Sequence, residues 1–155
     1  MIKTIFALLT ASSVAFGDGI SHNGFSESAV EAENLEAYSG TEFIKALCSL
    51  PRGTLYIRGT VLGWPNTNDI STLINMLDDK SPCRSVASFR SSWMGDGVSS
   101  VGQEVAFLLL GIKTGHYPPK LNSTRDTESV NREIQDWLST WNMKTDQIQT
   151  EPAHY

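Results

Sequence analysis

The sequence lacks the short motifs that accompany most catalytic and metal-binding sites. It contains no GxSxG, HExxH, CxxC, Walker or GxGxxG segment. None of its three histidines is paired with another at a spacing of four, and its two cysteines are far apart, so a zinc site is not expected. We therefore predict no catalytic residues, no metal and no cofactor.

Long apolar runs are also scarce. The run in MIKTIFALLTASSVAFGDG follows Lys3 and ends in small residues, with Ala15 and Gly17 at the −3 and −1 positions before Asp18. This is the pattern of a secretory signal peptide, with a buried core helix as the alternative, and no later segment reaches the ~20 apolar residues of a membrane span. We predict that residues 1–17 are removed near Gly17, leaving a periplasmic or secreted protein with no membrane attachment.

Export changes how the two cysteines are interpreted. In an oxidising compartment a pair of cysteines usually forms a disulfide, so we predict a bond between Cys48 and Cys83. A reactive thiol would need a histidine nearby. His22, His116 and His154 all fall in segments that are predicted as loops or tails.

Basic residues are outnumbered, with 12 Lys and Arg against 17 Asp and Glu and a net charge of −5. An acidic surface does not suit nucleic acid or anionic lipid, so neither is a predicted partner. Residues 18–36 are rich in Gly, Ser, Asn and Glu, and residues 143–155 have no sustained apolar period. We predict that both segments are disordered and that a single helical domain spans residues 37–142.

Most of this domain has the apolar spacing of amphipathic helices. Capping boxes at residues 39–42 (SGTE) and 100–103 (SVGQ) predict two helix starts. Further helices are expected after Asp69 and from Thr127, and residues 83–94 are roughly helical in pattern but rich in serine.

Residues 54–62, TLYIRGTVL, fit two structures. Leu55, Ile57 and Val61 alternate as in a strand, and a helix would contain Gly59 at a cost of up to ~1 kcal/mol. Because the flanking segments look helical and a lone strand would lack a partner for its backbone, we favour a helix. The predicted fold class is therefore all-α, a small bundle of about five helices stapled by one disulfide.

Aromatic residues beside turns are the candidates for a binding surface. Trp64 precedes Pro65, and Trp93 precedes the turn that contains Asp96. An aromatic side chain in such a place can anchor an interface or cover the edge of the core. We predict Trp64, Trp93 and Asp96 as partner-binding residues, with packing as the alternative for the tryptophans and a turn role for Asp96.

The order of several short motifs resembles one family of exported proteins. A helix ending in Cys48 is followed by Tyr-Ile-x-Gly at residues 56–59 and by Pro-Cys at residues 82–83. Then come VSSVGQ at residues 98–103, a Tyr-Pro-Pro link at residues 117–119 and an amphipathic last helix. This order is similar to that of the Rap/Tai group of periplasmic immunity proteins.

The similarity spans about residues 42–141 and has departures. The family commonly has a further cysteine near the Tyr-Ile-x-Gly segment and often one after the last helix, where this chain has RGT at 52–54 and TWN at 140–142. Its inhibitory contact residues are therefore not carried over to this sequence.

Members of that family are small helical proteins that bind and block peptidoglycan amidase effectors delivered by type VI secretion, often as dimers. The resemblance implies an exported, non-catalytic immunity protein or inhibitor, with a protein effector as its partner and a homodimer as its assembly.

Two other interpretations of the function stay open. One is a periplasmic acid-stress chaperone-like module, whose acidic groups would be protonated at low pH and loosen the fold. The other is an exported enzyme with an unrecognised site, for which Asp96 is the candidate.

Overall fold

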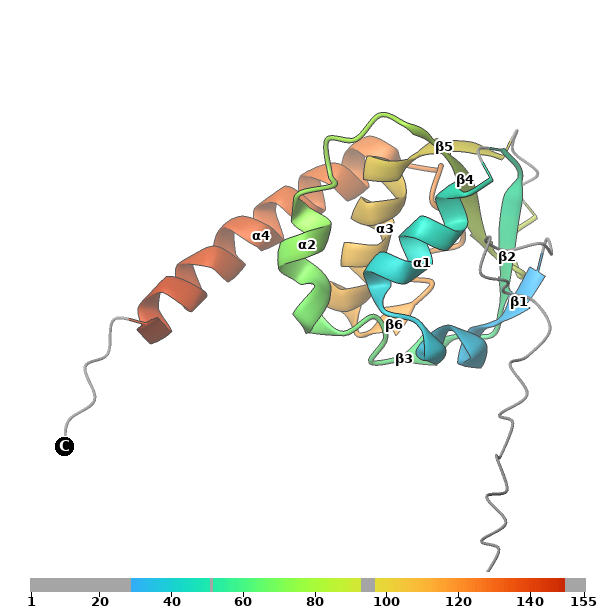
Figure 1. The fold of residues 1–155 in the computed structure, drawn as a ribbon. Coiled ribbons are helices and arrows are strands. Elements are labelled where there is room, and N and C mark those ends of the chain that lie inside the picture. Colours follow the sequence, from blue (N-terminus) through green and yellow to red (C-terminus); the bar gives the residue numbers. More distant parts are fainter. Residues whose placement is uncertain (1–28, 51, 93–96, 150–155) are drawn as a thin grey trace, which may run out of the picture.

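The computed structural model describes residues 29–50, 52–92 and 97–149, with side chains described as far as Trp141. The predicted signal peptide at residues 1–17 lies outside these ranges, as do Trp93 and Asp96. The described residues form a mixed α/β fold in which helices cover one face of a four-stranded sheet (Figure 1).

Strands and helices alternate along the first two thirds of the chain, and two long helices follow. In chain order the elements are β1 (Ala29–Glu31), the 3-10 helix η1 (Ala32–Ala37), α1 (Gly40–Cys48), β2 (Thr54–Arg58), β3 (Val61–Leu62), the 3-10 helix η2 (Thr67–Asp69), α2 (Ile70–Ile74), β4 (Pro82–Ser88), β5 (Val98–Ser100), α3 (Val101–Thr114), β6 (His116–Tyr117) and α4 (Thr127–Gln149).

The main sheet has the strand order β1-β2-β4-β5. β1, β2 and β4 run parallel, with Leu55 opposite Val86, and β5 is antiparallel to β4. Because the parallel strands follow one another in the same direction across the sheet, their crossover helices fall on the same side. Figure 1 shows α1, α2 and α3 on that side, and β3 pairs with β6 in a separate antiparallel ribbon.

The core lies between the sheet and the helices. Leu55 and Ile57 of β2 are fully buried, as are Phe43 and Leu47 of α1. α3 is buried along most of its length because it is covered by α1, the sheet and α4. Gly115 ends it in the left-handed conformation, with φ of +76°.

The all-α prediction is wrong, and β2 shows why. Leu55 and Ile57 point into the core at the two-residue period of a strand, with Tyr56 between them partly exposed. Gly59 and Gly63 have φ of +85° and +68°, which no right-handed helix allows. The objection that a lone strand lacks partners fails because β2 pairs with β1 and β4 on its two edges.

The strands β1 and β4, which pair with β2, were not predicted either, and for different reasons. β4 is buried at every residue from Cys83 to Ala87, so it has no alternation by which a strand could be recognised. β1 and η1 lie in the segment predicted to be disordered, yet Val30 and Leu35 are buried in the core. The fold therefore begins before residue 37, and α4 continues past residue 142 into the predicted C-terminal tail.

The predicted disulfide is confirmed. Cys48 and Cys83 are bonded, with an S–S distance of 2.04 Å and 4.4 Å between their Cα atoms. Cys48 is the last residue of α1, and Cys83 lies at the start of β4, so the bond attaches this helix to the sheet. Among the described helices, none has the length and apolarity to cross a membrane.

The predicted helix starts are confirmed at both capping motifs. Ser39 and Glu42 make the two reciprocal hydrogen bonds of a capping box at the start of α1. Ser100 caps α3 by accepting from the amide of Gln103 at 3.3 Å. The Gln103 side chain instead donates to the carbonyl oxygen of Ser123, which ties α3 to the loop before α4.

Candidate functional site

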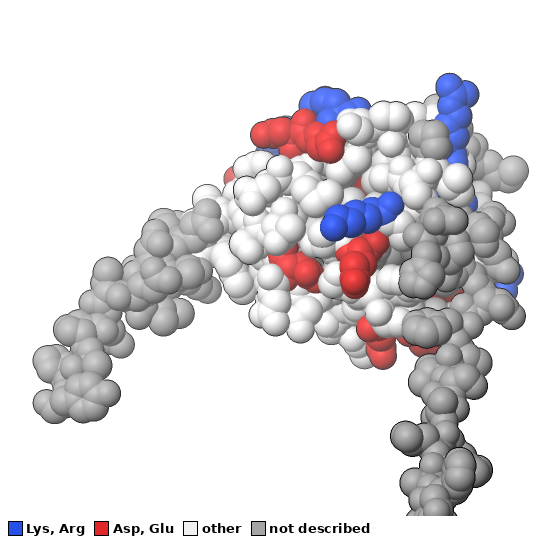
Figure 2. Space-filling model, viewed as in Figure 1, with Lys and Arg blue, Asp and Glu red and all other residues white. Residues whose placement is uncertain are grey.

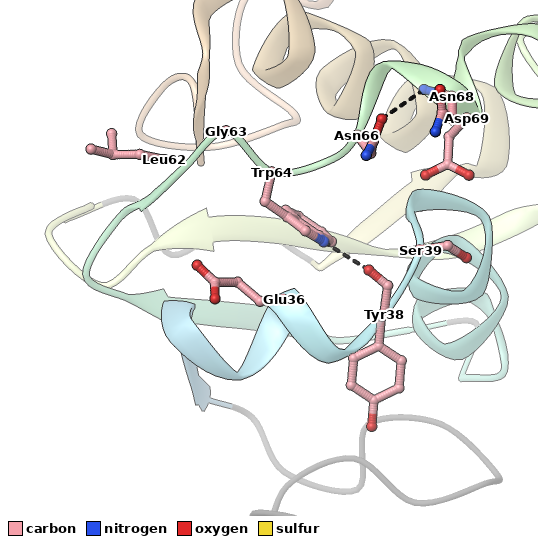
Figure 3. A pocket seen from close by; sticks show the side chains of 9 residues that line it. All are labelled: Glu36, Tyr38, Ser39, Leu62, Gly63, Trp64, Asn66, Asn68 and Asp69. Atoms are coloured by element: carbon pink, nitrogen blue, oxygen red, sulfur yellow. Dashed lines mark hydrogen bonds between the residues drawn. The ribbon is translucent and has the colours of Figure 1, made fainter.

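A surface hollow of about 390 Å³ lies where η1 meets α1, under the loop that joins β3 to η2 (Figure 3). Two segments that are distant in sequence meet there, the first from η1 into α1 and the second from β3 into η2. The residues that line the hollow are Glu36, Tyr38, Ser39, Leu62, Gly63, Trp64, Asn66, Asn68 and Asp69.

Trp64 forms the inner wall of the hollow and is only 7% exposed. Its ring packs edge-to-face on Phe43 and Tyr117, with centroids 5.2 Å and 5.1 Å away. Its indole N–H donates to the carbonyl oxygen of Tyr38 at 2.8 Å. These contacts fix the β3–η2 loop to the start of α1, so this wall of the hollow is rigid.

The polar side of the hollow is organised around the first turn of α1. The carboxylate of Asp69 accepts a hydrogen bond from the amide of Gly40 at 2.8 Å, at the positive end of the helix. Asn66 accepts from the amide of Asn68 at 3.0 Å and so shapes the η2 turn. The Glu36 carboxylate is exposed on η1, on the opposite side of Trp64 from Asp69.

The electrostatic character of the hollow is acidic. The described residues that line it include the acidic Glu36 and Asp69 and no lysine or arginine. Glu42 is hydrogen-bonded to Ser39 of the lining, and these hydrogen bonds lower the pKa of the Glu42 carboxyl, which is therefore ionised at neutral pH. Figure 2 shows acidic side chains over α1 and η1 on this face, with a basic side chain beside them.

The side chains of Leu62 and Tyr38 also line the hollow, and both point away from Trp64. Leu62 of β3 is 77% exposed, and Figure 3 shows that it projects away from Trp64 into solvent. The ring of Tyr38 also points away from Trp64, and burial, followed by the nearby Glu42, raises the pKa of its phenol. The hollow thus combines negative charge with one prominent apolar side chain on its rim.

Only one of the three predicted partner-binding residues falls in the described part of the chain. Trp64 packs against the core, as the alternative interpretation held, and it also lines the hollow. Glu36, Leu62 and Asp69 were not predicted. Asp69 was identified only as the residue before an expected helix, and Glu36 fell in the segment expected to be disordered.

Residues 122–124, Asn-Ser-Thr, match the sequence pattern of an N-glycosylation site, but Asn122 has a structural role. Asn122 is 4% exposed, and its side-chain oxygen accepts from the amide of Arg125 at 2.8 Å. Its backbone pairs with Ala87 beside β4. An asparagine held in this way does not present its amide nitrogen to a glycosylating enzyme once the protein is folded.

The described residues contain no group of three or more His, Cys, Asp or Glu side chains placed to hold a metal ion. Comparison with protein-family models, curated proteins and solved structures gives no match for the chain. The function is therefore argued from the geometry of the hollow, and the resemblance to the Rap/Tai group stays a prediction.

Proposed function

We propose that the protein is an exported, non-catalytic inhibitor that binds a protein partner through the hollow beside Trp64. The observation that carries the proposal is the combination of a rigid aromatic wall, two carboxylates in the lining and the exposed Leu62 on the rim. Tryptophan and tyrosine side chains in well-packed pockets are common anchors of protein interfaces.

The negative charge of the hollow indicates which kind of side chain the partner would place there. Glu36 and Asp69 favour a basic side chain of the partner inside the hollow, because a lysine or arginine there would meet carboxylates on two sides. Leu62 would bury its apolar surface against a neighbouring apolar residue of the partner. The wall formed by Trp64 limits the conformational entropy lost on binding, since its hydrogen bond to Tyr38 already orders the loop.

Export is supported by the signal-peptide pattern together with the disulfide. A bond between Cys48 and Cys83 is typical of oxidising compartments such as the bacterial periplasm. The particular partner we propose is a peptidoglycan amidase effector, which is what the resemblance to the Rap/Tai group implies. The helical fold that the resemblance also implied is wrong, so the support for a binding role comes from the hollow.

The test is inhibition of purified peptidoglycan amidases. Each enzyme is assayed for release of free amines from peptidoglycan with increasing amounts of the protein. We expect stoichiometric inhibition of one amidase, with Leu62→Asp and Glu36→Lys each weakening inhibition by at least about tenfold, which corresponds to roughly 1.4 kcal/mol.

Matched substitutions elsewhere on the surface provide the controls. Leu121→Asp makes the same change at an apolar residue that is 51% exposed, and Glu128→Lys makes the same charge reversal at the start of α4. Neither should alter inhibition. If no amidase is inhibited, or if the control variants lose inhibition as strongly as the hollow variants, the proposal is wrong.

A further inference from the structure

A second group of surface residues lies at the edge of the sheet where the parallel strands end. β1, β2 and β4 run in the same direction, so they end at the same edge, with Arg58 as the last residue of β2. Phe89 and Arg90 directly follow β4. The last amide of β4 donates to the carbonyl oxygen of Leu121 at 2.7 Å, which brings residues 120–121 to the same edge.

This edge also borders the hollow. η1 follows β1 directly, β3 follows β2 after Gly59 and Thr60, and both η1 and β3 supply residues of the lining. Among the described residues, five large apolar side chains are exposed, and three of them stand at this edge or on the rim of the hollow: Leu62, Phe89 and Leu121, with exposed fractions of 77%, 58% and 51%. Apolar side chains gathered in this way mark an interaction surface more often than single ones do.

Phe89 is held in place although it is exposed. The guanidinium of Arg58 lies over its ring, 4.9 Å from the centroid, and the same guanidinium pairs with Glu31 of β1 at 3.3 Å. The amide of Phe89 donates to the carbonyl oxygen of Ile57 at 2.8 Å, which ties this residue to β2. The ring is thus positioned before a partner arrives, which limits the entropy lost on binding.

Basic side chains outnumber acidic ones around Phe89 and Leu121, on a chain whose net charge is −5. The basic residues there are Arg58, Arg90, Lys113, Lys120 and Arg125, and the carboxylates are Glu31, Asp126 and Glu133. Glu133 is shared between Lys113 and Lys120, whereas Arg90 makes no ion pair with a described residue. We call the following residues the basic surface: Arg58, Phe89, Arg90, Lys120 and Leu121.

We infer that the basic surface binds an acidic segment of a protein partner, with an apolar side chain of that segment placed against Phe89 and Leu121. Carboxylates that flank this side chain would pair with Arg90 and Lys120, which are exposed beside the two apolar residues. The inference rests on the proposed function in one respect, namely that the partner in the hollow also supplies the acidic segment. Opposite charges at two neighbouring sites would then fix the orientation of that partner.

An anionic lipid bilayer fits the basic surface less well. Glu31 lies 3.3 Å from Arg58, and Glu133 lies 3.7 Å from Lys120, so both carboxylates would meet the phosphates of a bilayer. Like charges brought together in this way oppose binding. A peptide segment can instead place its carboxylates beside Arg90, away from both glutamates.

Two synthetic peptides of opposite charge test the inference by nuclear magnetic resonance. The peptides EEEFEEE and KKKFKKK are each titrated into the isotopically labelled protein, and its amide signals are followed. We expect EEEFEEE to shift the signals of Phe89, Arg90 and Leu121, and KKKFKKK to shift those of Glu36 and Asp69. Arg90→Glu should weaken binding of the acidic peptide about fivefold, because an attractive contact becomes a repulsive one. Phe89→Ala should weaken it as well, because the apolar contact is lost.

Arg52→Glu is the matched control, because Arg52 is exposed just before β2, at the opposite edge of the sheet, and should not contribute. If the shifts caused by EEEFEEE spread equally over basic residues elsewhere, or if Phe89→Ala leaves its affinity unchanged, the inference is wrong. Binding to phosphatidylglycerol vesicles that is lost in Arg90→Glu, with no response to EEEFEEE, would also overturn it and assign the surface to lipid. Shifts caused by EEEFEEE at the basic surface, with none caused by KKKFKKK at the hollow, would support the inference and contradict the proposed role of the hollow.

Discussion

The indole N–H of Trp64 donates to the backbone carbonyl of Tyr38 across 2.8 Å, and this bond joins the two segments that form the acidic hollow. Tyr38 directly precedes the capping residue of α1, while Trp64 follows β3. The binding surface proposed for this protein therefore depends on a contact between residues that are distant in sequence.

Replacing Trp64 with phenylalanine tests this contact. Phe retains an aromatic ring against Phe43 and Tyr117 but cannot donate to the carbonyl oxygen of Tyr38, so a buried acceptor loses its partner. We expect the free energy of unfolding to fall by about 1–3 kcal/mol, measured by urea denaturation. Trp137→Phe, at a partly buried ring that packs on Trp141, is the control and should change stability less.

Removing the disulfide should destabilise the protein without changing its fold. The double variant Cys48→Ala and Cys83→Ala opens a loop with a sequence separation of 35. The chain-entropy model then gives a loss of roughly 4 kcal/mol in the free energy of unfolding. The measurement is urea denaturation with and without a reducing agent. The reductant should weaken the wild type and leave the variant unaffected, and equal stabilities of the two oxidised proteins would contradict the expectation.

Local sequence signals predicted the parts of the fold that depend on nearby residues. Ser39 and Ser100 cap α1 and α3, as the capping-box motifs predicted, and α4 begins at Thr127 as expected. Each of these features depends on hydrogen bonds or apolar spacing within one or two helical turns. The disulfide could be predicted because the compartment and the presence of two cysteines limit the pairing.

The strands could not be predicted in the same way because their stability comes from distant partners. β2 is a strand because Leu55 lies opposite Val86 and Tyr56 lies opposite Ala29, and neither relationship is visible in the local pattern. The hollow could not be predicted for the same reason, since its lining residues are distant in sequence. Glu36 and Asp69 line the same hollow only because β2 lies between two crossovers that bring η1 and η2 to the same edge of the fold.

Gly102 provides a prediction about the packing of α3. A Cβ atom at this position would lie 2.0 Å from the carbonyl oxygen of Leu77, and backbone cannot move away as a flexible side chain can. We expect Gly102→Ala to lower the free energy of unfolding by about 2–4 kcal/mol, measured by thermal or urea denaturation.

A glycine without such a neighbour is the control for that substitution. Gly115 ends α3 with φ of +76°, and no atom of the described residues lies within 4 Å of a Cβ built there. Asparagine tolerates this left-handed conformation, so Gly115→Asn should cost less than about 1 kcal/mol. Similar losses in the two variants would mean that contact with Leu77 does not set the cost at Gly102.

The buried carboxyl of Glu104 predicts how stability depends on pH. Its pKa is about 8 in the folded protein and 4.5 as a reference for the unfolded chain, so between these values the folded state holds one proton more. The free energy of unfolding should therefore fall as pH rises from about 4.5 to about 8, by at most about 5 kcal/mol, and this contribution is fully present only below the lower value. Urea denaturation at pH 5, 6, 7 and 8 measures this slope, which Glu104→Gln should largely abolish.

The same series separates the proposed inhibitor from an acid-activated chaperone. A chaperone that loosens in acid must lose stability as pH falls through the mildly acidic range, whereas protonation of Glu104 stabilises the fold in that range. Glu42, Asp79 and Glu133 have lowered pKa values, so they act in the opposite direction, but only near and below their ordinary pKa values of about 4 and at exposed or partly exposed positions where the effect is small. If the wild type is less stable at pH 5 than at pH 7, Glu104 does not control stability in this range, and the chaperone alternative gains support over the inhibitor.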